Sequence, residues 1–115
     1  MSKGVTFISS LTVALKAKEK IEQNYTNPDF SVRELAGLME FHEVYIRKVF
    51  AKHIQKSPNA VIKEVRMLKA RELMQAGSTV QAAADAVGIP DASYFCKCYK
   101  KFFGYPPSKE NLQEK

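Results

Sequence analysis

Apolar residues recur every three or four positions along most of the 115-residue chain, which is the spacing of amphipathic helices. Valine, isoleucine and threonine never gather into the alternating runs that are typical of strands. In the first such segment, Leu11 to Gln23, the outer face is rich in lysine and glutamate, and the expected apolar stripe is formed by Leu11, Ala14, Leu15, Ala17, Lys18 and Ile21. The sequence therefore predicts an all-α fold of about seven helices.

Helix-breaking and helix-capping residues divide the chain into these elements. Asn27-Pro28 ends the first segment. Ser31-Val-Arg-Glu34 predicts a capping box, in which the serine oxygen accepts the amide of Glu34 while the glutamate returns to the serine amide. Pro58 stands in the first turn of the longest helix, and Gly77 closes that helix. The later helices are predicted at Val32 to Met39, Glu43 to Ile54, Pro58 to Gln75, Val80 to Val87 and Ala92 to Phe103, before a polar tail from Ser108 to Lys115.

The chain contains an internal repeat. The residue types from Val32 to Phe41 recur from Val80 to Ile89. After one extra residue, those from Tyr45 to Phe50 recur from Tyr94 to Tyr99. Each copy is a short predicted helix, a tight turn and a longer predicted helix, which is the order of a helix-turn-helix unit.

The repeat also meets the packing needs of two crossing helices. Ala36 and Ala84 supply the small residue where the helix axes approach, and Phe41 and Ile89 are expected to be buried from the turns. Gly88 can adopt positive φ in the second turn, whereas the first copy has glutamate there. We therefore expect one domain over residues 1–115, with helix-turn-helix subdomains at 11–57 and 77–112 joined by a linker helix at 58–76.

The positive charge is concentrated on the second helix of each copy. The chain carries a net charge of +6, and its pI is about 9.4. Segments 43–56 and 92–103 hold the whole of this excess, because basic and acidic residues balance in the remainder. Two repeat-related basic helices in an otherwise neutral chain favour nucleic acid as the partner. On the linker helix, Arg66 and Arg71 could contact DNA or pair with Glu64 or Glu72.

Other chemistries find little support in the sequence. Cys96 and Cys98 would point roughly 200° apart on a helix and have no further ligand nearby, so neither a disulfide nor a metal site is expected. His42 and His53 belong to no catalytic pattern, and no nucleophile motif or phosphate-binding loop is present. The tyrosines and phenylalanines, at helical spacing, are expected in the core. We expect no enzyme activity, no cofactor, no membrane span and a cytoplasmic location.

Several stretches of the chain match the pattern of one known family: Phe30-Ser-Val-Arg-Glu-Leu-Ala36, Tyr45-Ile-Arg-Lys-Val-Phe50, Ser57-Pro58, Arg66-Met-Leu-Lys-Ala-Arg-Glu-Leu-Met74, Ala83-Ala-Asp-Ala-Val-Gly-Ile89, Asp91-Ala-Ser-Tyr-Phe-Cys-Lys-Cys-Tyr-Lys-Lys-Phe-Phe-Gly104 and Pro106-Pro-Ser108. On these stretches the sequence resembles the AraC family of bacterial transcription regulators, from about Leu11 to Leu112. The serine-tyrosine-phenylalanine and lysine-lysine-phenylalanine-phenylalanine-glycine runs also resemble the DNA-binding ends of hybrid two-component regulators.

This resemblance implies two recognition helices in successive major grooves of double-stranded DNA, with RNA polymerase as a candidate partner and a sensor or receiver domain elsewhere. Arg47 would pair with guanine through two hydrogen bonds, and Val44 would meet a thymine methyl group. By match to the family pattern, the base-facing positions are His42, Val44, Arg47 and Lys48 in the first copy, and Ala92, Ser93, Cys96 and Lys97 in the second. The expected phosphate contacts are Lys52, Lys56, Lys100 and Lys101, together with the helix N-termini near Ser31 and Thr79.

The sequence departs from the family where many members have arginine, at Lys48 and Lys97. Lysine lacks the planar fork that pairs with guanine through two bonds. Ala92 and Cys96 offer little hydrogen bonding, so the first copy is expected to read bases and the second to act mainly as an anchor. Two other functions remain open: a basic helical module that binds an acidic protein, and a DNA-binding protein without sequence preference. The chain could be a small regulator by itself or a fragment of a longer one.

Overall fold

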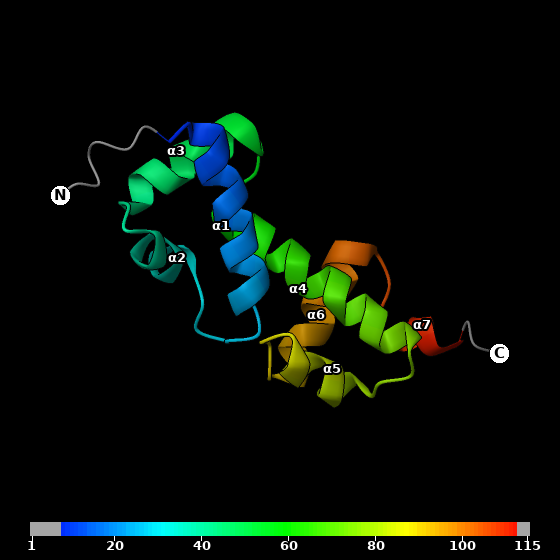
Figure 1. The fold of residues 1–115 in the computed structure, drawn as a ribbon. Helices are drawn as coiled ribbons and strands as arrows, with labels where there is room; N and C mark the ends of the chain where they lie inside the picture. The colour runs from blue at the N-terminus through cyan, green and yellow to red at the C-terminus, as the bar shows by residue number, and fades with distance from the viewer. Residues whose placement is uncertain (1–7, 113–115) are drawn as a thin grey trace.

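The computed structural model describes residues 8–112, with side chains to residue 110, and this part of the chain is entirely helical (Figure 1). An all-α fold with two helix-turn-helix units is therefore confirmed. The described part is elongated, with extents of 57 × 22 × 20 Å. Its helices are α1 (Ser10–Asn24), α2 (Val32–Met39), α3 (Glu43–His53), α4 (Pro58–Gln75), α5 (Val80–Ala86), α6 (Ala92–Phe103) and α7 (Ser108–Leu112).

Side-chain caps begin most of these helices. The side-chain oxygens of Ser9, Ser57, Thr79 and Asp91 each accept a backbone amide of the first turn at 3.1 Å, in α1, α4, α5 and α6 respectively. These bonds satisfy donors that have no partner within the helix. For the six helices whose bounds the sequence predicts, the observed bounds differ by no more than one residue. The short helix α7 was missed, because it lies in the segment that was predicted to be a polar tail.

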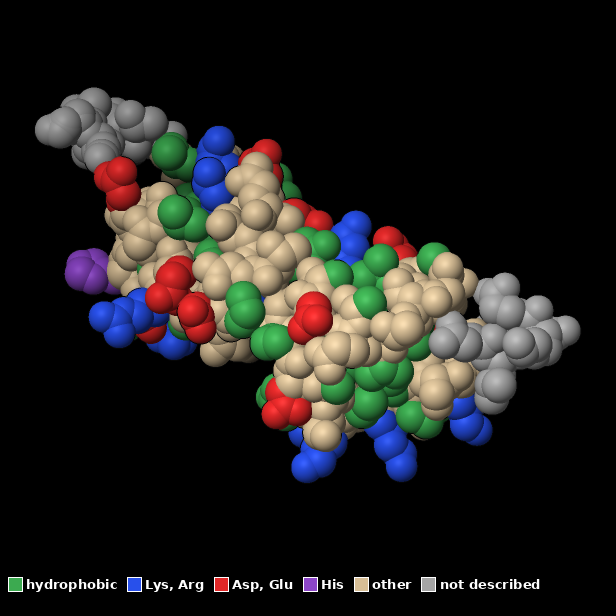
Figure 2. All heavy atoms as spheres, turned by 90° about the horizontal axis from the view of Figure 1, so that it is seen from below, with side chains coloured by type: hydrophobic (Ala, Val, Ile, Leu, Met, Phe, Trp, Pro, Cys, Tyr) green, Lys and Arg blue, Asp and Glu red, His purple; other side chains and the backbone are tan. Residues whose placement is uncertain are grey.

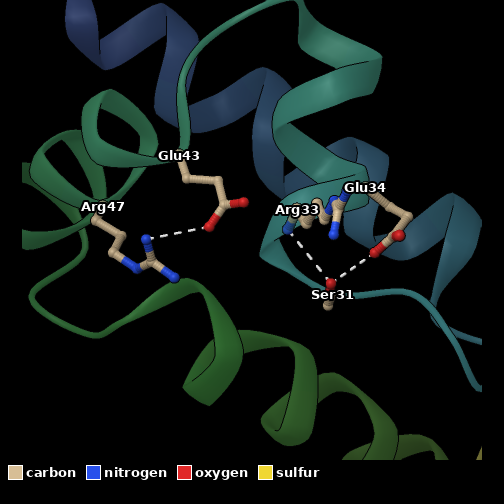
Figure 3. A network of polar contacts seen from close by, with 5 residues as sticks. All are labelled: Ser31, Arg33, Glu34, Glu43 and Arg47. Carbon is tan, nitrogen blue, oxygen red and sulfur yellow. Dashed lines mark hydrogen bonds and ion pairs between the residues drawn. The ribbon is translucent and has the colours of Figure 1, made fainter.

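The cap at Ser31 differs in one partner from the predicted capping box. Its Oγ accepts the amide of Arg33 at 3.3 Å, not that of Glu34, and its hydroxyl donates to the Glu34 carboxylate at 2.5 Å (Figure 3). The short bond to the carboxylate holds the serine oxygen beside the earlier amide of the turn. The cap is still a closed local network, so α2 starts where the sequence predicts.

The apolar stripe predicted on α1 is confirmed in part. Its members Ala14, Ala17 and Ile21 are buried, but Leu11 and Leu15 are 51% and 59% exposed. Val13, which was not expected in the stripe, is buried. Successive helical residues turn by about 100°, so the buried arc is centred near Ala17 and the two leucines lie beyond its edge. The small alanines of this arc let α1 pack closely on its neighbours.

Two hydrophobic cores stand side by side along the molecule. The first is formed by α1, α2, α3 and the start of α4, with Val61 and Ile62 as the contribution of α4. The second is formed by α5, α6 and the rest of α4, from which Met67, Ala70 and Met74 are buried. The linker helix therefore belongs to both cores, and Figure 1 shows it running from one to the other.

The turns of the two helix-turn-helix units have the same backbone geometry. Glu40 and Gly88 both adopt left-handed φ, at 62° and 82°. In each turn, the next residue donates its amide back into the preceding helix at 3.0 Å, from Phe41 to Ala36 and from Ile89 to Ala84. This is the Schellman ending of a helix, which glycine favours but which Glu40 also adopts here.

The predicted burial of the turn residue holds in one copy only. Ile89 is 8% exposed, but Phe41 is 37% exposed. Phe41 instead packs against the ring of Tyr45, with ring centroids 4.9 Å apart, and lines a groove of about 440 Å³ with Val13 and Met39. The larger aromatic ring is accommodated at the surface of the first core.

Candidate nucleic-acid interface

Helices α3 and α6 each bury one face and expose the other. In α3, Ile46, Val49 and Phe50 are buried in the first core. In α6, the buried side chains are Phe95, Cys98 and Tyr99. Residues of the repeat that match in sequence therefore also match in burial, and the opposite face of each helix is open to a partner.

The first copy exposes all four of its predicted base-facing side chains. Val44 is 61% exposed, and Lys48 is exposed beside it. His42 is the N-cap residue of α3, and its imidazole makes no cap hydrogen bond. Arg47 is exposed, and its Nη1 lies 3.2 Å from Oε1 of Glu43, one turn earlier on the helix (Figure 3). An aliphatic group, two cations and an imidazole thus project from the first two turns of α3.

The second copy offers a smaller set of accessible groups. Ser93 and Lys97 are exposed, but Ala92 and Cys96 are half-buried, and Cys96 packs against the second core. Asp91 caps the helix through the amide of Tyr94 and places a carboxylate at the N-terminus of α6. The base-facing positions of α6 therefore present fewer accessible polar groups than those of α3.

Some of the side chains predicted to contact phosphates are accessible, and others already have a partner within the protein. Lys52, Lys100 and Lys101 are exposed. Lys56 forms an ion pair with Glu64, in which both oxygens lie 3.0 Å from Nζ. Thr79 is exposed, but its hydroxyl, like that of the half-buried Ser31, accepts a backbone amide, so these residues could offer DNA only the remaining amides of their helices.

Lysine and arginine side chains project from both halves of the molecule. Figure 2 shows lysine and arginine side chains projecting along the lower edge of the view in both halves, with a histidine at one end. The half-buried His53 takes no part in an exposed cluster, because its Nε2 lies 2.6 Å from Oγ of Ser10. Within residues 8–112, no group of three or more histidine, cysteine or acidic residues is placed to hold a metal ion.

Several aromatic side chains that were expected in the core lie at the surface. Phe41, Tyr45, Tyr94 and Phe102 are between 36% and 54% exposed. Tyr45 and Tyr94 occupy the same place in the two copies, in the first turn of each recognition helix. Both tyrosines lie near the base-facing positions and are therefore candidate DNA contacts. Their helical spacing alone had placed them in the core. The repeat alignment was the signal that could have identified them.

Within the described residues, the linker arginines pair with neither Glu64 nor Glu72. Arg66 donates to the backbone oxygens of Tyr25 and Asn27, and Arg71 lies over the ring of Phe103 at 4.5 Å. Both therefore hold the fold together. No helix in residues 8–112 combines the length and apolar character needed to cross a membrane.

The geometry agrees with a comparison of the chain with known families. A model described as "Helix-turn-helix domain" matches residues 25–111. The chain belongs to the AraC family of helix-turn-helix DNA-binding domains. This family comprises DNA-binding domains of transcriptional regulators.

Individual relatives agree in fold and extent. A probable AraC family transcriptional regulator from Rhodopseudomonas palustris is 30% identical, with a TM-score of 0.73 over 88% of this chain and 96% of that one. The DNA-binding domain of AdpA, solved in complex with a target DNA, has a TM-score of 0.79 at 15% identity, over 87% and 90% of the two chains. The regulator GbdR of Pseudomonas aeruginosa is 29% identical over 91 residues, which are 78% of this chain and 24% of GbdR.

Proposed function

We propose that this domain binds an operator with α3 and α6 in successive major grooves on one face of the DNA. The observation that carries the proposal is the exposure, in repeat-related positions, of the polar face of each recognition helix. Major grooves on one face lie about 34 Å apart. The 57 Å length of the domain accommodates two helices at this separation.

In this proposal the first copy supplies most of the direct base readout. Arg47 pairs with the O6 and N7 of a guanine, and Lys48 reaches a second guanine. Val44 contacts a thymine methyl group, and His42 lies at the edge of the same groove. The exposed positions of all four side chains support these roles.

The second copy then acts mainly as an anchor. Ser93 and Lys97 are its available polar contacts, because Ala92 and Cys96 are half-buried and present little hydrogen-bonding capacity. Lys52, Lys100 and Lys101 neutralise phosphates, and Lys56 does so after leaving Glu64. Backbone amides near Ser31 and Thr79 complete the phosphate contacts.

The proposal includes partners beyond DNA. GbdR is about four times as long as the region that matches this chain, which covers 24% of it. We propose that a sensor or receiver domain controls this DNA-binding domain and that RNA polymerase is a further partner. The family implies a binding function with no catalytic step of its own.

Selection from a randomised double-stranded library tests the proposal. We expect one enriched motif with two conserved blocks about one helical turn, roughly 10 base pairs, apart. The block read by α3 should hold more sequence information than the other. Equal binding to all sequences, lost by about 200 mM salt, would show a non-specific DNA-binding protein instead.

A further inference from the structure

The loop between α1 and α2 lies against both halves of the molecule. It begins at Tyr25, whose side chain packs against the second core although α1 belongs to the first. Figure 1 shows the loop beside the turn between α5 and α6. Among the helices of residues 8–112, only α4 contributes buried residues to both cores, so this loop is a second connection between them.

Arg66 fastens the middle of the linker helix to this loop. Its Nε donates to the backbone oxygen of Tyr25 at 2.9 Å, and its Nη2 donates to that of Asn27 at 2.8 Å. The guanidinium is partly buried, and the desolvation lowers its pKa below the ordinary value. Two charge-assisted bonds from one planar group fix the loop in both position and orientation on α4.

Gly88 brings the turn of the second helix-turn-helix unit onto the same loop. A Cβ atom at this position would lie 2.6 Å from the backbone oxygen of Tyr25 and 3.1 Å from that of Thr26. Only a residue without a side chain permits this approach between two backbones. Gly88 therefore serves the contact between the halves as well as the positive φ of its own turn.

The loop itself is held by internal hydrogen bonds. The amide of Asn27 donates to Asn24, and the amide of Phe30 donates to Asn27. The side chain of Asn27 also accepts the amide of Asp29 at 2.9 Å. A loop with these bonds can transmit a fixed geometry from Arg66 and Gly88 to the start of α2.

We propose that Arg66 and Gly88 are positioning residues that set the separation and rotation of α3 relative to α6, and hence the half-site spacing that the domain accepts. The inference rests on the proposed function, in which both helices bind one operator. While Arg66 and Gly88 hold the loop between α1 and α2, only the native half-site spacing lets both recognition helices bind. Without this hold on the loop, α4 alone joins the halves, and neighbouring spacings become acceptable.

The first test measures binding of Arg66→Met to the selected operator and to operators with one base pair added or removed between the half-sites. We expect the wild-type domain to lose at least tenfold in affinity at each altered spacing, and the variant to lose less than threefold. Lys69→Met, on the same helix, is the control for loss of one positive charge and should keep the wild-type spacing preference. An unchanged spacing preference in Arg66→Met would overturn the inference.

Gly88→Ala tests the other contact against a matched glycine. Gly77 also adopts positive φ, at 99°, but a Cβ there meets nothing within 4 Å. Both alanine variants carry the cost of positive φ, and only Gly88→Ala also presses on the loop. We expect Gly88→Ala alone to flatten the spacing preference. Equal spacing profiles in the two variants would contradict the role of the contact.

A measurement without DNA separates this inference from the proposed function. Spin labels at Lys52→Cys and Lys101→Cys, in a Cys96→Ser and Cys98→Ala background, report the distance between the recognition helices. We expect a narrow distance distribution with Arg66 present and a broader one in Arg66→Met. If the distribution broadens while no sequence-specific binding is found, the positioning role stands and the proposed function fails. An equally narrow distribution overturns the positioning role.

Discussion

Nη1 of Arg47 lies 3.2 Å from Oε1 of Glu43, one turn earlier on the first recognition helix (Figure 3). Both side chains are substantially exposed, at 51% and 39%. The pair therefore forms on the face proposed to meet DNA, where the carboxylate and a base compete for the same guanidinium. Base readout by Arg47 requires that this pair open or rotate.

Replacing Glu43 with glutamine should strengthen DNA binding. The change removes a competitor for Arg47 and a negative charge near phosphates, so we expect affinity to rise about twofold, since an exposed pair of this spacing contributes about 0.3–0.5 kcal/mol. Titration of a fluorescent operator measures the change. Glu72→Gln, which alters a similar pair with Lys69 on α4, is the control and should leave affinity unchanged. A fall in affinity for Glu43→Gln would mean that the carboxylate orients Arg47 toward the base.

The two recognition helices should respond differently to alanine substitution. Arg47→Ala is expected to cost about 1–3 kcal/mol of binding free energy and to remove the preference at one base pair. Lys97→Ala should weaken binding by a similar amount on matched and mismatched operators, because α6 acts as an anchor. Affinities for a panel of single-base operator variants separate the two results. A loss of preference at one base pair in Lys97→Ala would show that Lys97 reads a base and does not act only as an anchor.

Lys100 and Lys101 should govern the salt dependence of binding. Both are exposed at the end of α6. Each phosphate contact adds about 0.9 to the slope of log affinity against log salt concentration, so the double alanine variant should lower that slope by about 2. The sequence preference should stay the same. Lys18→Ala, on an exposed position of α1, should leave the slope unchanged.

A buried carboxylate at the C-terminal end should contribute strongly to stability. Glu110 is fully buried, and its Oε2 accepts hydroxyl groups from Tyr99 at 2.8 Å and Tyr105 at 2.6 Å. Its Oε1 accepts the amide of Gln75 at 3.3 Å, so α7 is fastened to α4 and α6. Glu110→Gln replaces an acceptor with a donor that the tyrosines do not need. We expect a loss of about 1–3 kcal/mol in the free energy of unfolding, measured by urea titration.

The buried carboxylate of Glu110 should also govern how stability depends on pH. Burial raises the pKa of Glu110, but hydrogen bonds from Tyr105, Tyr99 and Gln75 outweigh it, so its pKa lies below the ordinary 4.5. A carboxyl group whose pKa is lower in the folded protein than in the unfolded chain stabilises the fold at pH values above its unfolded pKa. This stabilisation is lost as the pH falls through its folded pKa. We therefore expect wild-type stability to decline below about pH 4.5, and Glu110→Gln to decline less steeply. The hydrogen bond from Ser31 lowers the pKa of Glu34 as well. Because Glu34 is present in both proteins, it adds the same amount to the slope of stability against pH in each. Equal slopes would contradict the role of Glu110.

Much of this fold follows from local sequence signals. Caps such as Ser57 and Asp91 and the turn glycine Gly88 act within a few residues, and they place the helix boundaries without tertiary information. The stripe predicted on α1 was too wide, because Leu11 and Leu15 also fit helical spacing, and only the packing of the alanine-rich face against neighbouring helices decides which of these residues are buried.

The candidate site divides in the same way. The charge pattern and the repeat identify the exposed face of α3, because Arg47 and Lys48 are neighbours in sequence as well as in space. The pair between Lys56 and Glu64, and the contact of Arg66 with Tyr25 and Asn27, join distant segments, and no local pattern reports them.

The binding of two major grooves by two unequal helices is tested most directly by guanine N7 methylation interference on the selected operator. We expect two clusters of interfering guanines on one face of the DNA, about one helical turn apart, with the stronger cluster in the half bound by α3. In Arg47→Ala, one guanine of the stronger cluster should lose its effect. A single cluster, or no interference in the major groove, would contradict the account.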